Sequence, residues 1–282
     1  MVVCNPMRGV MVGLWMLGWV ACQEAAPTPV STPQPVETAT AEAHAEADTR
    51  ALRVLPTQPV RGTLLLDAGH GAPGNPGNEN CRCEAEQDVM LRVAGRVRAW
   101  LRQEGVKVRE TRPDGAPTPY PERLRMTRGV DWMVSLHSDS RAGYELMRDP
   151  ATGCWRNHGA TGFAVLWSDE GEKALVDGRH GLARALARRM VEAGFEAYPG
   201  RDYDGLYAGD EVPGVFVDRH EDRKRIMLLR RPKAPSVIVE THQAWDVGES
   251  AMWEQEETAS AFASAIAAAL ADQEGAAAGR GE

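Results

Sequence analysis

Three side chains that could bind a metal ion or carry a proton each stand at the end of a short apolar run. His70 follows the run TLLLD, His137 ends the run MVSL, and Glu240 ends the run VIV. Runs of this length are typical of buried strands. Because an open α/β sheet brings the carboxyl ends of its parallel strands to one edge, we expect these three side chains to lie close together there.

Two imidazoles and one carboxylate form a ligand set that leaves a catalytic zinc ion with one open position. Glu86 is the first residue of the predicted helix that follows the loop after the first strand, so it can reach the same edge of the sheet. Glu84 is an alternative candidate for the carboxylate ligand. Zinc lowers the pKa of a bound water to about 7, and a carboxylate outside the metal shell is then needed to move the proton. Glu240 is placed for that second role.

The elements that position these residues alternate between strand and helix. The predicted strands cover residues 63–67, 106–111, 132–138, 162–167 and 236–241, and the predicted helices cover residues 86–103, 121–128, 172–193 and 250–271. This alternation predicts an α/β fold, in which a single catalytic domain has an open twisted, mostly parallel sheet with helices on both faces. Residues 200–225 do not fit the alternation and are predicted to be an insertion.

Both ends of the chain are predicted to lie outside this domain. Residues 1–21 contain an apolar run that is shorter than a membrane span, and they are interpreted as a signal peptide. Residues 22–59, rich in Ala, Pro, Thr and Glu, are predicted to be a disordered tether, and residues 275–282 a disordered tail. The catalytic domain is therefore expected to cover residues 60–274.

Cys22 stands where a bacterial lipoprotein would carry its lipid. It follows Val20 and Ala21 in a pattern that resembles the lipobox, although Trp19 replaces the usual leucine. We therefore predict lipid attachment at Cys22, membrane anchoring through that lipid, and a periplasmic location in the bacterial cell envelope as an outer-membrane lipoprotein. An ordinary secretory signal cut nearby is the alternative, and both interpretations place the protein outside the cytoplasm.

The charge balance of the chain is acidic, with 40 Asp and Glu against 32 Lys and Arg and a formal net charge of -8. A surface that binds nucleic acid would need a basic face, so we expect no nucleic-acid partner. The same balance is compatible with a carbohydrate or peptide substrate.

Three cysteines remain for the folded domain once Cys4 and Cys22 are assigned to the N-terminal segment. In an oxidising compartment one pair can form a disulfide, and we predict that Cys154 pairs with either Cys81 or Cys83. A bridge between Cys81 and Cys83 themselves would be strained. Export also argues against thiolate metal ligands at these two positions, because reduced thiols are hard to keep outside the cytoplasm.

The remaining histidines receive no predicted role. His44 lies in the tether, and His158, His180 and His220 stand at no predicted strand end. His242 would share the face of Glu240 if that strand continues, but no pattern assigns it any chemistry.

Several short motifs together resemble the zinc-dependent N-acetylmuramoyl-L-alanine amidases. The motifs are LDAGHG around His70, a glutamate that opens a helix ending near Gly105, the pair Thr111-Arg112, VSLHSD around His137, and PSVIVE ending at Glu240, and the resemblance extends over about residues 62–271.

This resemblance implies that His70, Glu86 and His137 hold Zn²⁺ and that Glu240 is catalytic. The family's spacing between its glutamate and the glycine after its helix favours Glu86 over Glu84, counted back from Gly105. The implied reaction is hydrolysis of the amide bond between N-acetylmuramic acid and L-alanine in peptidoglycan, and an activator protein is a possible further partner.

The chain also departs from the family pattern. Division-linked members carry an inhibitory helix between the second histidine and the late glutamate, and residues 201–225 stand in that place here. Residues 141–160 look added, and the residues that follow Glu240 differ from the usual segment. These departures surround the expected cleft, so they affect the preferred stem peptide more than the chemistry.

Two other functions are compatible with the same residues. A zinc carboxypeptidase would use a similar site, with Arg112, our predicted substrate-binding residue, gripping a terminal carboxylate. Such enzymes usually hold the first histidine and the glutamate close together in sequence, unlike His70 and Glu86. A non-catalytic envelope-binding protein with this fold would have no need of a general base such as Glu240.

Overall fold

The computed structural model describes residues 52–142, 145–222 and 224–278. The predicted signal peptide, Cys22 and most of the predicted tether lie outside the described residues, as do residues 279–282. Within the described ranges, no helix combines the length and the apolar character that crossing a bilayer requires.

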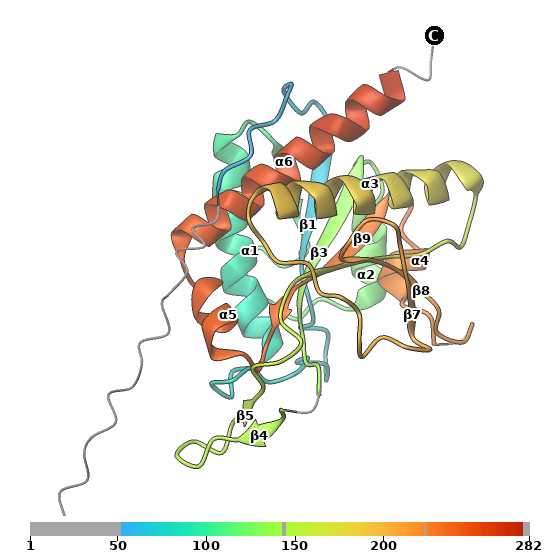
Figure 1. The fold of residues 1–282 in the computed structure, drawn as a ribbon. Coiled ribbons are helices and arrows are strands. Elements are labelled where there is room, and N and C mark those ends of the chain that lie inside the picture. Colours follow the sequence, from blue (N-terminus) through green and yellow to red (C-terminus); the bar gives the residue numbers. More distant parts are fainter. Residues whose placement is uncertain (1–51, 143–144, 223, 279–282) are drawn as a thin grey trace, which may run out of the picture. The chain divides into compact units, whose positions relative to one another are not determined.

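Seven strands form one mixed sheet in the order β2-β1-β3-β9-β6-β8-β7 (Figure 1). The strands are β1 (Thr63–Ala68), β2 (Lys107–Glu110), β3 (Trp132–Asp139), β6 (Ala164–Trp167), β7 (Tyr207–Gly209), β8 (Val215–Asp218) and β9 (Ser236–Gln243). Neighbouring strands are parallel except at the β6–β9 and β7–β8 pairs. The predicted α/β fold with a mostly parallel sheet is therefore confirmed.

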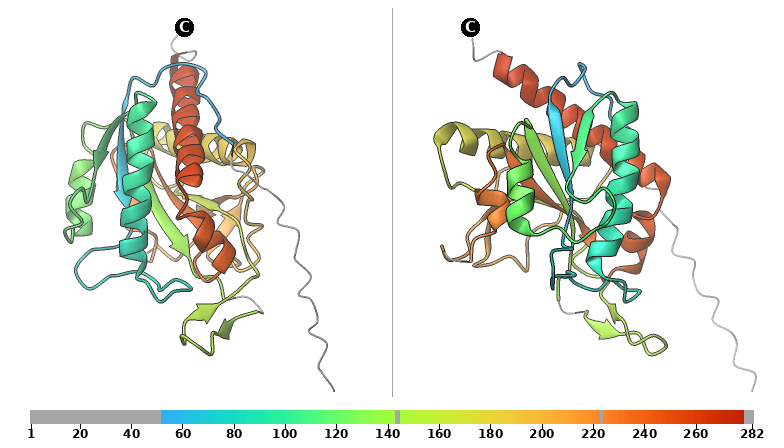
Figure 2. Two further views of the ribbon diagram at one scale, coloured as in Figure 1. Left: turned by 90° about the vertical axis from the view of Figure 1, so that its left-hand side faces the viewer. Right: turned by 180° about the vertical axis from the view of Figure 1, so that it is seen from behind.

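Helices cover both faces of the sheet, and Figure 2 shows α2 and α6 on opposite sides of it. Helices α1 (Glu86–Gln103), α3 (Lys173–Glu192) and α6 (Glu256–Ala278) share one face, where α6 packs against both of the others. The short helices α2 (Tyr120–Met126) and α4 (Met227–Arg230) cover the other face, and α5 (Val247–Met252) connects β9 to α6.

Strand β1 shows how one strand serves both faces. Leu64 and Leu66 are buried in the core beneath α1, α3 and α6, whereas Leu65 is buried with Met133 and Leu228 on the opposite face. A strand that is covered on both faces has a continuous apolar run, which is why its sequence alone predicted it.

The described part of the predicted tether, residues 52–59, contacts the domain through hydrogen bonds. The Val54 N–H donates to Ser264 Oγ at 2.9 Å, and Gln58 Nε2 donates to the carbonyl of Ala271 at 2.9 Å. These contacts use backbone and amide groups rather than an apolar period, so composition did not indicate them.

The C-terminal helical region also differs from its predicted form. The single helix expected over residues 250–271 is divided between α5 and α6 by a break at residues 253–255. The break carries Trp253, which is 1% exposed, so the chain turns where it buries this large ring. Helix α6 then runs to Ala278, past the predicted boundary at residue 274, because its alanine-rich sequence favours helix.

The predicted insertion adds strands β7 and β8 to the sheet rather than a separate element. Within residues 201–222 and 224–225 there is no helix, so the described part of this stretch does not supply an inhibitory helix.

The segment that looked added, residues 141–160, forms a small hairpin of β4 (Met147–Arg148) and β5 (Trp155–Arg156). A disulfide between Cys83 and Cys154 ties this hairpin to the loop before α1. This confirms the predicted pairing of Cys154 with a loop cysteine and identifies Cys83 as its partner.

Candidate metal centre and catalytic site

Three adjacent parallel strands bring the predicted site residues to one edge of the sheet. His70 lies in the loop that follows β1, His137 lies near the end of β3, and Glu240 lies on β9. The register pairs His137 directly with Glu240, and Glu86 is the first residue of α1. Strand order brings the three strand-end residues together, as the sequence predicted, and the start of α1 brings Glu86 to them.

Two glycines are required for the close packing of this loop. A side chain at Gly69 would place its Cβ 2.4 Å from the Leu136 carbonyl oxygen and 2.7 Å from the His137 ring. Gly77 has φ +82 and a Cβ there would lie 2.6 Å from Glu86 Oε2. Glycine is the residue that allows both the left-handed backbone and the close approach.

The ligand atoms of the two histidines converge on one buried carboxylate. His70 Nε2 lies 3.0 Å from Glu86 Oε2, and His137 Nδ1 lies 3.1 Å from Glu86 Oε1. One ligand atom from each of the three residues lies within 4.8 Å of the others, as a three-ligand metal site requires. Burial alone would raise the pKa of Glu86, but hydrogen bonds from His137 and His70 outweigh it and lower the pKa to about 2, so the carboxylate is ionised.

Each imidazole has a hydrogen-bond partner on its other nitrogen. His70 Nδ1 lies 2.9 Å from Asn75 Oδ1, and His137 Nε2 lies 3.1 Å from Ser135 Oγ. Ser135 in turn donates to the buried carboxylate of Asp67. Partners of this kind orient metal-binding imidazoles and leave the other nitrogen free for an ion, so the donor set fits a divalent metal.

The sequence analysis missed this supporting layer. Asp67 also accepts from Arg123 Nη1 at 3.0 Å, and both side chains are fully buried. Arg123 further donates to the carbonyl of His70, so one buried ion pair supports both histidines. The signal was a charged residue inside the apolar run TLLLD, because an aspartate in a buried strand needs partners.

Glu240 is half-buried and stands beside His137 without belonging to the three-ligand group. Burial, followed by the negative charge of Asp139, raises the pKa of Glu240 to about 8. A carboxyl group whose pKa lies near the working pH can both accept and return a proton, which suits a general acid–base residue.

Arg112, the predicted substrate-binding residue, lies beside the loop that carries His70. It is 3% exposed, and Nη1 donates to the carbonyls of Gly69 at 3.2 Å and Gln87 at 3.3 Å. These contacts hold the loop around His70 in place.

The other candidates lie apart from the metal ligands. Glu84, the competitor of Glu86, forms ion pairs with Arg82 and Arg92. His242 is buried and stacks on Trp253 with ring centroids 5.8 Å apart. Three further histidines, none of them in the three-ligand group, each pair with an aspartate: His158, His180 and His220.

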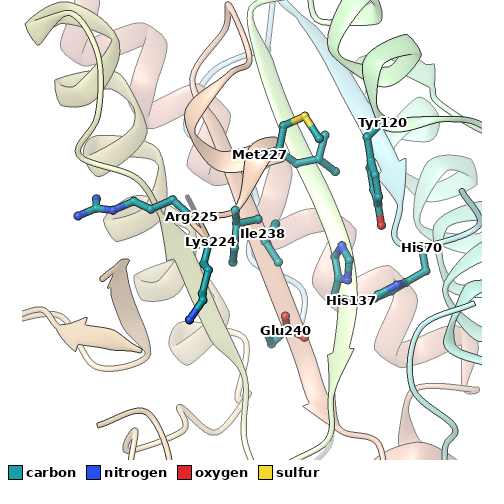
Figure 3. A pocket seen from close by; sticks show the side chains of 10 residues that line it. His70, Tyr120, His137, Lys224, Arg225, Met227, Ile238 and Glu240 are labelled. Atoms are coloured by element: carbon teal, nitrogen blue, oxygen red, sulfur yellow. The ribbon is translucent and has the colours of Figure 1, made fainter. Parts of the chain in front are cut away.

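A cavity of about 380 Å³ lies at this edge of the sheet. Its lining consists of His70, Tyr120, His137, Lys224, Arg225, Ile226, Met227, Leu228, Ile238 and Glu240. Figure 3 shows Glu240 and His137 on neighbouring strands with His70 beyond His137, while Arg225 points away from both imidazoles. The cavity therefore gives a substrate access to two of the three ligands and to the proposed base.

A family model described as N-acetylmuramoyl-L-alanine amidase matches residues 64–272 of the chain. The match covers most of the chain and all four residues of the site. The chain therefore belongs to the N-acetylmuramoyl-L-alanine amidase family.

Individual relatives agree with this assignment at low identity. The chain is 25% identical over 201 residues to N-acetylmuramoyl-L-alanine amidase AmiA of Salmonella typhimurium, and 25% identical over 194 residues to AmiA of Escherichia coli. Each match covers 63% of this chain and 64% of the relative, so the chain spans slightly less than two thirds of their length.

Solved structures show the same fold. The chain is similar to the N-acetylmuramyl-L-alanine amidase Ami1 of Mycobacterium smegmatis with a TM-score of 0.59 at 20% identity, covering 78% of this chain and 100% of that one. It is also similar to the amidase AmiC2 of Nostoc punctiforme, with a TM-score of 0.52 at 20% identity over 74% of this chain and 94% of that one.

Proposed function

We propose that this protein is a zinc-dependent peptidoglycan amidase that hydrolyses the amide bond between N-acetylmuramic acid and L-alanine. The observation that carries the proposal is the convergence of His70, Glu86 and His137 beside Glu240, in a chain that belongs to the amidase family. A protein that only binds the envelope would have no use for a carboxyl group held at a raised pKa beside a metal-ligand set.

The three ligands have complementary tasks in this proposal. His70 Nε2, His137 Nδ1 and the ionised Glu86 carboxylate would hold the zinc ion. When bound, zinc supplies a Lewis acid that polarises the scissile carbonyl and makes water more acidic. Asn75 and Ser135 keep the two imidazoles in the orientation that aims these nitrogens at the ion.

Glu240 acts as the general base and then as the general acid. Its carboxylate accepts a proton from the attacking water as the new bond to the carbonyl carbon forms. The same group then delivers that proton to the amide nitrogen as the carbon–nitrogen bond breaks, so the peptide leaves with a free amino group. A pKa raised to about 8 favours the first half of this cycle, because it makes the carboxylate a stronger base toward the attacking water.

The cellular setting is a further part of the proposal. Peptidoglycan as substrate requires an envelope location, which the predicted signal peptide, the lipid at Cys22 and the Cys83–Cys154 disulfide all support. An outer-membrane lipoprotein and an activator protein stay predictions. Mass spectrometry of the N-terminal peptide after membrane extraction tests the lipid, and an unmodified Cys22 would contradict it.

Digestion of purified peptidoglycan with the zinc-loaded protein tests the reaction. Soluble stem peptides with a free N-terminal L-alanine, together with glycan strands that have lost their peptides, are the expected products by mass spectrometry. Free C-terminal amino acids would instead indicate a carboxypeptidase, and intact peptidoglycan bound by a zinc-containing protein would indicate a binding protein.

A further inference from the structure

A second cavity, of about 310 Å³, adjoins the catalytic carboxyl group. Its walls come from two segments together with Glu240. One segment is residues 139–142, from the last residue of β3 onward, and the other contributes Asp202, Tyr203, Leu206 and Tyr207, up to the first residue of β7. Of the residues in the described ranges, Glu240 alone lines both cavities, and no metal ligand lines the second one. A substrate cut beside Glu240 can therefore extend into two different surroundings.

Arg141 is built into the wall of the second cavity. It is 2% exposed, its Nε donates to Asp139 Oδ2 at 2.9 Å, and its Nη1 donates to the Gly162 carbonyl at 2.8 Å. Its Cζ lies 3.8 Å from the centre of the Tyr198 ring. Nη2, however, is buried and has no hydrogen-bond partner among the described residues. The guanidinium is sealed beneath the wall, so a ligand in the cavity does not reach it, and Arg141 fixes the shape of the wall.

Tyr207 provides an unused donor that a ligand in this cavity can reach. Its ring is half-buried beside Tyr203, with ring centroids 4.7 Å apart, and its hydroxyl forms no hydrogen bond to the residues that the structure describes. Burial and the negative charge of Glu240 raise the pKa of Tyr207, so the hydroxyl keeps its proton. The two rings also offer apolar faces of the kind that stack on other flat or apolar surfaces.

The second cavity is acidic, because Asp139, Asp202 and Glu240 line it beside a single arginine. The cations of the first cavity are already paired, Lys224 with Glu221 and Arg225 with Asp169 and Glu170. Asp139 is already paired with Arg141, but Asp202 is exposed at the rim. A stem peptide carries free carboxylates and would be repelled there. A neutral ligand with carbonyl oxygens, hydroxyl donors and an apolar face fits these groups.

We propose that the second cavity binds the N-acetylated amino sugar of the substrate, with the Tyr207 hydroxyl donating to one of its oxygens and Asp202 accepting from one of its hydroxyls. This inference rests on the proposed amidase function and deepens it. The glycan lies on one side of Glu240, and the stem peptide lies in the first cavity with the metal ligands.

Two substrates that differ only in the sugar test this assignment. The rate of peptide release is measured with an N-acetylmuramoyl tripeptide and with the matching D-lactoyl tripeptide, which keeps the scissile amide but lacks the sugar ring. Tyr207→Phe should lower kcat/KM for the muramoyl substrate by about 3- to 10-fold, the effect of one lost hydrogen bond, and leave the lactoyl substrate unchanged. Asp202→Asn should act in the same direction.

A matched control removes a hydroxyl from the other cavity. Tyr120, whose hydroxyl accepts from Asn75 Nδ2 at 2.7 Å, lines only the first cavity, so Tyr120→Phe should change both substrates by the same factor. Equal effects of Tyr207→Phe on both substrates, or no effect on either, would overturn the sugar site.

Binding without turnover separates this proposal from the reaction itself. Calorimetry with N-acetylglucosamine, a neutral N-acetylated amino sugar, should show weaker binding to the Tyr207→Phe protein than to the wild type, with melting temperatures that agree. Equal binding, or none to the wild type, would remove the sugar site. Failure to cut any substrate while the wild type still binds the sugar would instead remove the proposed reaction.

Discussion

The two halves of the sheet contribute to the site in different ways. Strands β1, β3 and β9 carry motif residues, and their parallel register places His70, His137 and Glu240 at one edge. Strands β6, β8 and β7 carry none of the four site residues, yet the chain that leads into β7 supplies walls of the second cavity. The contrast shows that the reactive groups depend on strand ends, whereas the shape of the surroundings depends on packing between distant segments.

The two halves are joined at a few defined points. Glu240 lines both cavities, Arg141 connects the end of β3 to residues near β6, and the Cys83–Cys154 disulfide connects the metal-side loop to the hairpin. Substitutions at these points, and at positions within the half that contains β1, β3 and β9, test whether the two halves contribute differently to the site.

The largest effect is expected at the residue that both cavities share. Glu240→Gln removes the proton carrier while keeping the shape of the side chain, so kcat/KM for peptide release should fall by about 10²- to 10⁴-fold. Zinc content per chain, measured by atomic emission, should match the wild type because Glu240 is not among the three ligands. A variant that binds zinc and cuts at the wild-type rate would refute the role of Glu240.

The next largest effect is expected where the disulfide joins the two regions. Cys83→Ser opens a link between residues 71 positions apart in sequence, which should lower the free energy of unfolding by about 2–4 kcal/mol in guanidinium titrations without reductant. Cys81→Ala is the control, because Cys81 is a free buried thiol and its loss leaves the link intact. Equal stability of the Cys83→Ser and wild-type proteins would show that the bridge does not constrain the chain.

A smaller effect is expected from the support beneath one ligand. Ser135→Ala removes the contact to His137 Nε2 and leaves Asp67 with one acceptor site unused, so zinc affinity should fall by about 10- to 100-fold in competition with a chelator. Ser236→Ala is the matched control, since that buried serine on β9 donates only to the Leu229 carbonyl. Unchanged affinity in both variants would exclude an orienting role for Ser135.

The smallest effect concerns acid stability behind the site. Burial, followed by the positive charge of Arg141, lowers the pKa of His242 to about 3, so the folded state holds it neutral while the unfolded chain binds a proton below its ordinary value of 6.5. Stability from this group is therefore present above that value and is lost as the pH falls toward 3. Between pH 7 and pH 5 the loss should be about 2 kcal/mol at 1.36 kcal/mol per unit.

His242→Phe isolates this contribution, because it keeps a ring against Trp253 and removes the titrating nitrogens. As the pH is lowered from 7 to 5, the unfolding free energy of the wild type should fall by about 2 kcal/mol more than that of the variant. Parallel stability curves for the two proteins across this range would contradict the assignment.

Sequence patterns determined the main strands, the long helices and the four residues of the site. Continuous apolar runs predict strands that are buried on both faces, and parallel strands bring their carboxyl ends together whatever the details of packing. The amphipathic pattern placed Glu86 at the first turn of α1 but left Glu84 as its competitor, and the resemblance to the amidase family favoured Glu86. These are local or topological properties, so the order of residues is enough to predict them.

Only the tertiary structure decided which groups support the site and what surrounds it. The contact of Ser135 with Asp67, the use of Arg112 on loop carbonyls, the choice of Cys83 over Cys81 and the second cavity beside Glu240 all depend on segments far apart in the chain. A hydrogen bond is decided by distances of a few tenths of an ångström between such segments, and no pattern of residue types encodes a distance of that kind. The chemistry of the site was therefore predictable from residue types and strand ends, while the partners and cavity walls required packing.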